Sequence, residues 1–95
     1  MLTTQPVKYV LVSNTTATIK PTVAGSDVRG ELYGFICLTN TTVTAYNNTA
    51  ASGSVIYPAT ALTAGQVVHF GGPGILFNIG LTIVSSGGNV NVLYV

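Results

Sequence analysis

The sequence predicts an all-β protein: a single small antiparallel β-sandwich or compact jelly roll of about eight short strands. Val, Ile, Thr, Tyr and Phe, which favour strands, dominate almost every segment of the 95-residue chain. Gly, Asn, Pro and Ser interrupt these segments about every ten residues, as turns do in a β-sandwich. No stretch has the spacing of an amphipathic helix, and a parallel sheet would need crossover helices.

The predicted strands are residues 7–12, 16–20, 31–39, 42–46, 54–57, 66–70, 81–85 and 89–95. In the last of these, alternation places Val90, Val92 and Tyr94 on one face. In the segment 42–46 it places Val43 and Ala45 towards the core. We expect residues 1–95 to form one domain, with residues 1–6 as a flexible N-terminal arm.

The segment 31–39 is apolar on both faces of the predicted strand. Strict alternation assigns one face to Leu32, Ile36 and Leu38 and the other to Tyr33, Phe35 and Cys37. A strand that is apolar on both sides is central and covered twice. We expect the second sheet to cover one face and a neighbouring subunit the other.

Charge is scarce, at 5% of residues against about 25% in ordinary soluble domains. All five charged residues lie between Lys8 and Glu31, and the net charge is +1. Such a surface belongs either to a Thr-rich soluble monomer or, as we favour, to a protein covered by neighbouring subunits. Three scattered basic residues make neither a nucleic-acid-binding patch nor a basic surface for membranes.

The beginning of the sequence lacks the basic and apolar regions of a signal peptide, and no apolar run is long enough to span a membrane. The chain has a single cysteine, Cys37, so it cannot form an internal disulfide. We therefore expect synthesis in a reducing cytoplasm.

Asp27, Arg29 and Glu31 are two residues apart and share one side of an extended segment. They form either a carboxylate pair for acid–base chemistry or, as we favour, a surface ion-pair cluster that fixes the register between subunits. His69 and Cys37 complete neither a catalytic triad nor a zinc site, so we expect a half-buried strand histidine and a buried cysteine. The glycine-rich segment 71–74 predicts a tight turn. We expect no catalytic residue, no cofactor and no metal, and hence no enzyme.

Five segments carry a resemblance to a known family: residues 23–26 (VAGS), 30–35 (GELYGF), 42–48 (TVTAYNN), 74–84 (GILFNIGLTIV) and 90–95 (VNVLYV). Together they resemble small β-sandwich virion proteins of tailed bacteriophages, over roughly residues 23–95. The sequence departs from the family pattern at Asn47, where aspartate is common.

The resemblance implies a capsid decoration (cement) protein on the outer surface of the phage head, where it bridges major capsid subunits. It also implies a homo-oligomer, most often a trimer. The candidate subunit contacts are Tyr33, Phe35, Asp27, Arg29 and Glu31. The alternative is a head-fibre or tail module that stacks host carbohydrate on tyrosines. The absence of a collagen-like or heptad stalk favours decoration.

Overall fold

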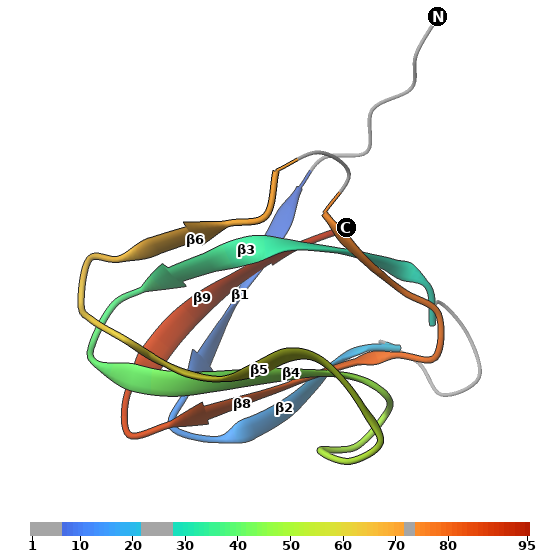
Figure 1. Ribbon diagram of the computed structural model, residues 1–95, viewed down its shortest axis with the longest axis horizontal. Helices are drawn as coiled ribbons and strands as arrows, with labels where there is room; N and C mark the ends of the chain where they lie inside the picture. The colour runs from blue at the N-terminus through green and yellow to red at the C-terminus, as the bar shows by residue number, and fades with distance from the viewer. Residues whose placement is uncertain (1–6, 22–27, 72–73) are drawn as a thin grey trace, which may run out of the picture.

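The computed structural model describes residues 7–21, 28–71 and 74–95. These contain nine strands in two antiparallel sheets that pack face to face (Figure 1). The strands are β1 (Lys8–Ser13), β2 (Thr16–Lys20), β3 (Gly30–Cys37), β4 (Thr41–Asn47), β5 (Ser54–Leu62), β6 (Val67–His69), β7 (Ile75–Phe77), β8 (Leu81–Ser86) and β9 (Asn89–Tyr94). The prediction of a small β-sandwich is confirmed. The predicted arm, residues 1–6, lies outside the described residues.

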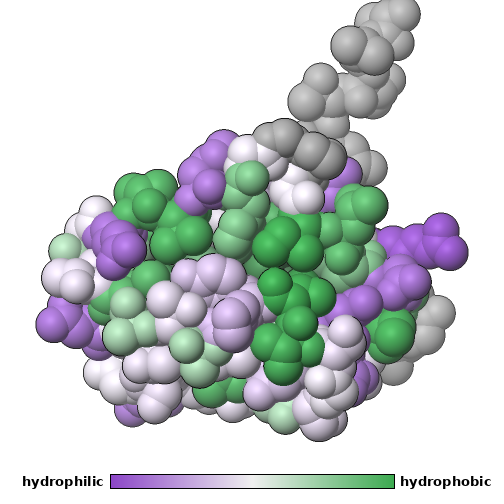
Figure 2. Space-filling view, viewed as in Figure 1, coloured by the Kyte–Doolittle hydropathy of each residue, from purple (hydrophilic) through white to green (hydrophobic). Residues whose placement is uncertain are grey.

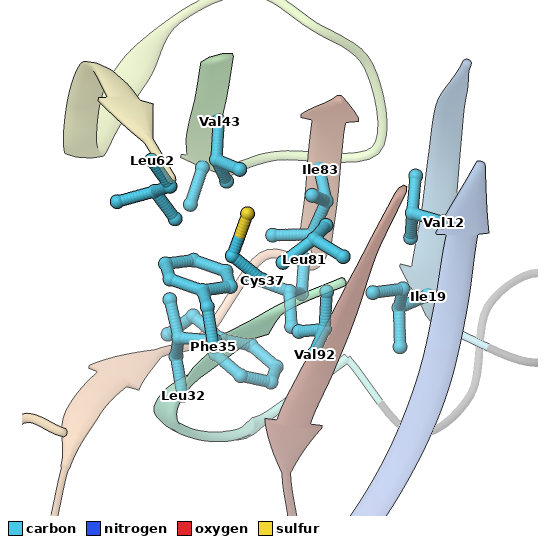
Figure 3. Packing of buried hydrophobic residues seen from close by; sticks show 13 residues of the cluster. Val12, Ile19, Leu32, Phe35, Cys37, Val43, Leu62, Leu81, Ile83 and Val92 are labelled. Atoms are coloured by element: carbon cyan, nitrogen blue, oxygen red, sulfur yellow. The ribbon is translucent and has the colours of Figure 1, made fainter. Parts of the chain in front are cut away.

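Sheet A has the strand order β1-β9-β3-β6, with β7 also paired to β3, and sheet B has the order β2-β8-β4-β5. Their inner faces enclose one hydrophobic core (Figure 3). The following core residues are at most 1% exposed: Val12, Leu32, Phe35, Cys37, Val43, Ala45, Leu81, Ile83, Val90 and Val92. The rings of Tyr57 and Phe70 pack on Phe35, with centroids 5.0 and 5.9 Å away. They extend the apolar packing beyond the fully buried residues.

Strand β9 is central in sheet A, between β1 and β3. Its alternation is as predicted, because Val90 and Val92 are fully buried while Asn91 and Leu93 are partly exposed. Strand β4 also follows the prediction: Val43 and Ala45 are fully buried. In both strands the period of two is uninterrupted where it faces the core.

The predicted faces of β3 are wrong, because the strand contains a bulge. Leu32 pairs with Tyr94 and Gly34 with Leu93, so β3 advances two residues while β9 advances one. Tyr33 is the extra residue, and it shifts the alternation that follows it. Leu32, Phe35 and Cys37 consequently all face the core, and Ile36 lies on the outer face of sheet A.

Most strand ends lie within one or two residues of the prediction, and the larger departures are at β5 and β7. Strand β5 continues through Pro58 to Leu62 instead of ending at residue 57. Pro58 is tolerated because β5 is an edge strand and is bulged there: Val43 pairs with Thr60 but Ala45 with Tyr57. Strand β7 was not predicted, because only three residues pair and glycines and a proline precede it.

Candidate interaction surface

The predicted contact residues do not all reach the surface. Tyr33 and Glu31 are partly exposed in β3, and Arg29 is exposed just before it. Phe35 has no exposed surface, because the bulge in β3 turns its ring into the core. Phe35 is therefore unavailable to a neighbouring subunit, and its assignment as a contact is corrected. Asp27 lies outside the described residues.

Glu31 is held by Tyr33 and not by the expected ion pair. The Tyr33 hydroxyl donates a hydrogen bond of 2.6 Å to Oε2 of Glu31. This bond, aided by desolvation and by the negative charge of Glu31, raises the pKa of Tyr33 above its usual value of 10.0. Within the described part of the chain, Arg29 and Glu31 form no ion pair. The Arg29–Glu31 half of the predicted ion-pair cluster is thus replaced by a tyrosine–carboxylate hydrogen bond.

The outer face of sheet A carries two rows of paired residues. In one row Leu11 lies opposite Asn91, Asn91 opposite Ile36, and Ile36 opposite Val67. The second row lies two residues along the strands and is Tyr9, Leu93, Gly34 and His69. Side chains opposite each other in such rows lie about 4.5–5.5 Å apart at Cβ. The rows therefore form one continuous surface.

Most of this surface is apolar and open to solvent. We call the following residues the sheet A patch: Tyr9, Leu11, Ile36, Val67, Leu76 and Leu93. Tyr9, Leu76 and Val67 are 73%, 66% and 60% exposed. Figure 2 shows hydrophobic side chains reaching the surface over β6, while the most hydrophilic ones lie mainly near the outline. Contiguous exposed apolar surface commonly marks an interaction site.

Glycine at position 34 is what lets β6 join this face. A Cβ atom there would overlap the carbonyl oxygen of Val68, so any side chain would push β6 away from β3. Gly74 has a similar role beside Tyr33. Its φ is +78°, and a Cβ atom would lie 2.7 Å from the carbonyl oxygen of Leu32. Both glycines allow the backbone to approach β3 closely.

The other residues weighed for chemistry are kept apart by the fold. Cys37 is buried as predicted, and its Sγ donates a hydrogen bond to the carbonyl oxygen of Thr39. His69 is exposed at the end of β6, which corrects the expected half-buried position. Its Nδ1 accepts a hydrogen bond of 3.1 Å from the Gly71 amide. Because Gly34 and Cys37 face opposite sides of sheet A and His69 pairs with Gly34, His69 and Cys37 lie on opposite faces.

The glycine-rich segment forms the predicted turn at its two described ends. Gly71 and Gly74 have φ angles of +69° and +78°, and the Gly74 amide donates to the Gly71 carbonyl oxygen. Residues 72–73 lie outside the described ranges. In those ranges there is no cluster of three or more His, Cys, Asp or Glu residues that could hold a metal ion. Nor do they contain a helix able to cross a membrane.

A shallow depression of about 290 Å³ lies on sheet B. It is lined by Asn40, Thr41, Thr42, Ala61, Leu62, Thr63 and Ser86. All these side chains are uncharged, and none of them is aromatic. Most of these lining residues are polar, whereas the sheet A patch consists of exposed apolar and aromatic side chains, so the patch is the better candidate for binding a protein.

The fold and this surface define a small antiparallel β-sandwich with one apolar outer face. Comparison with protein families, with characterised proteins and with solved structures finds no match to this chain.

Proposed function

We propose that the protein is a structural virion protein, a capsid decoration (cement) protein. It binds the outer surface of a phage head and stabilises the shell by bridging major capsid subunits. The observation that carries this proposal is the sheet A patch, which exposes Tyr9, Leu11, Val67 and Leu76 on one sheet face. The partner in this proposal, the major capsid protein, is inferred from the resemblance of residues 23–95 to phage virion proteins.

The chemistry of the patch suits docking onto a protein. Burying apolar surface contributes roughly 25 cal/mol per Å² removed from water. None of the six residues of the sheet A patch is acidic or basic, and Glu31, which lies opposite Leu76, is already hydrogen-bonded to Tyr33, so docking desolvates little charge. Repetition of the subunit around a shell multiplies weak contacts, so each single contact need not be strong.

Binding to shells tests the proposal directly. The purified protein is mixed with empty shells of the major capsid protein encoded alongside it, and co-sedimentation measures the bound fraction. We expect saturable binding and a higher disruption temperature for decorated shells. Failure of the folded wild-type protein to bind such shells would contradict the proposal. Binding to cell-surface carbohydrate instead would support the fibre or tail module, with the exposed ring of Tyr9 as its stacking platform.

A matched pair of variants locates the contact. Val67→Lys places a charge inside the sheet A patch, whereas Val55→Lys places the same charge on β5 of sheet B. Both valines are exposed, at 60% and 48%, so neither change should unfold the domain. We expect Val67→Lys to weaken shell binding at least about tenfold and Val55→Lys to leave it unchanged. If both variants bound shells equally well, the contact with the shell would not be on the outer face of sheet A.

A further inference from the structure

The two sheets end in edge strands, and most of these edges are protected against pairing with another chain. Strand β5 contains Pro58 and two register shifts. Strand β2 contains a register shift between Thr18 and Lys20, and β6 and β7 are only three residues long. Proline, bulges and short length are the features that natural proteins use to block edge pairing.

Strand β1 lacks these protections. It has six residues, no proline and an unbroken register with β9 from Lys8 to Ser13. In the described part of the chain no strand lies on its other side. Its outward side chains, Tyr9 and Leu11, are 73% and 53% exposed. Strand β1 is thus an open, regular and largely apolar edge.

Hydrogen bonds at the end of β1 show which backbone groups are free. The Asn14 amide, just after β1, donates to the Gly88 carbonyl oxygen, so this amide points towards the β9 side. The Asn89 carbonyl oxygen accepts from Leu38 on the opposite side, which fixes the same alternation in β9. In an antiparallel ladder this direction alternates along the strand. The amides and carbonyls of Tyr9, Leu11 and Ser13 therefore point to the open edge.

We infer that β1 pairs in antiparallel orientation with β1 of a second copy, across a two-fold axis at Leu11. Residues that lie opposite each other in an antiparallel pair point to the same face of the sheet. With the two-fold axis at Leu11, every paired residue of β1 lies opposite a residue of the second copy that points to its own face. Leu11 lies opposite Leu11, Tyr9 opposite Ser13, and Val10 opposite Val12. An axis at Val10 would instead place the Lys8 ammonium opposite the buried Val12. The axis at Leu11 leaves Lys8, the one charged residue of the strand, beyond the paired segment.

The pairing of β1 with β1 does not depend on the proposed function. Its consequence for the size of the shell-binding face does rest on that function. The four strands in the main path of sheet A, about 4.8 Å apart and about 20 Å long, give one copy an outer face of roughly 400 Å². A stable protein–protein interface buries about 800 Å² on each partner. Two copies joined at β1 present one continuous sheet with a face of about that size. A two-fold contact gives a dimer, in place of the trimer that the resemblance implies.

The mass of the full-length protein in solution tests this inference. Sedimentation equilibrium at micromolar concentration should give twice the chain mass of 9.8 kDa. Leu11→Lys places two ammonium groups opposite each other at the axis and should weaken dimerisation at least about tenfold. Val67→Lys, at the far edge of the same face, should remain a dimer. A monomeric or trimeric wild type, or a Leu11→Lys variant that stays fully dimeric, overturns the inference.

Cross-linking fixes the register. In the proposed pair the two Leu11 Cα atoms are about 5.5 Å apart, within the range of a disulfide. Leu11→Cys should therefore form a covalent dimer with oxidised glutathione, while Val67→Cys should remain a single chain on a non-reducing gel. A dimer in which Leu11→Cys does not cross-link uses another surface, and this overturns the inference. Shell binding is measured separately, so dimerisation and decoration can fail independently.

Discussion

Asn47 and Asn78 are joined by two hydrogen bonds that tie the end of β4 to the turn between β7 and β8. The Asn47 Oδ1 accepts from the Asn78 amide at 3.1 Å, and its Nδ2 donates to Asn78 Oδ1 at 3.0 Å. The same Oδ1 also accepts from the Ile79 amide at 2.9 Å. The Asn47 side chain therefore holds the connection in which the chain passes from β7 of sheet A to β8 of sheet B.

Replacing Asn47 with alanine should lower the free energy of unfolding by about 1–3 kcal/mol, because two backbone amides lose their acceptor. Asn47→Asp should cost less, because a carboxylate still accepts from both amides and loses only the Nδ2 donor. Urea denaturation measures both changes. The control is Asn91→Ala on the outer face, which should change stability by less than about 0.5 kcal/mol. Equal losses at positions 47 and 91 would contradict this account.

The Glu31–Tyr33 hydrogen bond predicts a dependence of stability on alkaline pH. The pKa of Tyr33 is raised in the folded protein, so the bond stabilises the fold below pH 10.0 and is lost as the pH rises through the raised pKa. Glu31→Ala should lower the pKa of Tyr33 and flatten the dependence. Absorbance titration measures tyrosine ionisation, and Tyr33→Phe identifies which transition belongs to this residue. An unchanged titration in Glu31→Ala would refute the assignment.

Removing residues 92–95 should be severely destabilising, because it shortens the central strand of sheet A. Val92 is fully buried, and Val95 exchanges two backbone hydrogen bonds with Glu31. Each buried side chain of this size contributes roughly 1.5–3 kcal/mol, against a total of about 5–15 kcal/mol for a domain. Thermal melting of the truncated protein measures the loss. A melting temperature within a few degrees of the full-length value would show that this strand end is dispensable.

Gly34→Ala should destabilise the protein by several kcal/mol or detach β6 from sheet A, because the new methyl group overlaps the Val68 carbonyl oxygen. Gly65→Ala is the matched control. Position 65 has free space for a Cβ atom, so only its φ of +87° opposes the change, at a cost of about 1–2 kcal/mol. Hydrogen exchange of the Val68 region distinguishes local detachment from global unfolding. Similar stability of the two variants would mean that β6 can shift without cost.

Much of the fold could be predicted from the sequence because its local signals agree with its tertiary structure. In β9 the alternation of Val90 and Val92 with Asn91 matches a strand with one face in the core. In β3 the same rule failed, since a bulge at Tyr33 depends on pairing with a strand more than fifty residues later. The prediction that the strand ends before Pro58 failed for a similar reason, because only the position of β5 at the edge of its sheet makes a proline acceptable there.

The candidate surface was predicted only in part. Glu31 and Tyr33 lie on the outer face of sheet A, but Phe35 does not, because its face was inferred from uninterrupted alternation. Leu11 was missed, and Tyr9 was considered only among the tyrosines that could stack carbohydrate, although the sequence carries the signal of both. Residues 9–12 are all apolar or aromatic, so this strand too has hydrophobic side chains on both faces. Which of the two faces is solvent-exposed depends on the sandwich itself.

The pairing of β1 with β9 and of β2 with β8 has a consequence for the order of folding. Among the described strands, the first two pair only with the last two, so neither sheet can close before β8 and β9 leave the ribosome. Until then the apolar residues of β1 have no sheet to join. We expect the domain to fold after these strands emerge and in one cooperative step. Because its contacts are long-range, stopped-flow refolding should take milliseconds to seconds, and a microsecond phase that forms sheet A would contradict this order.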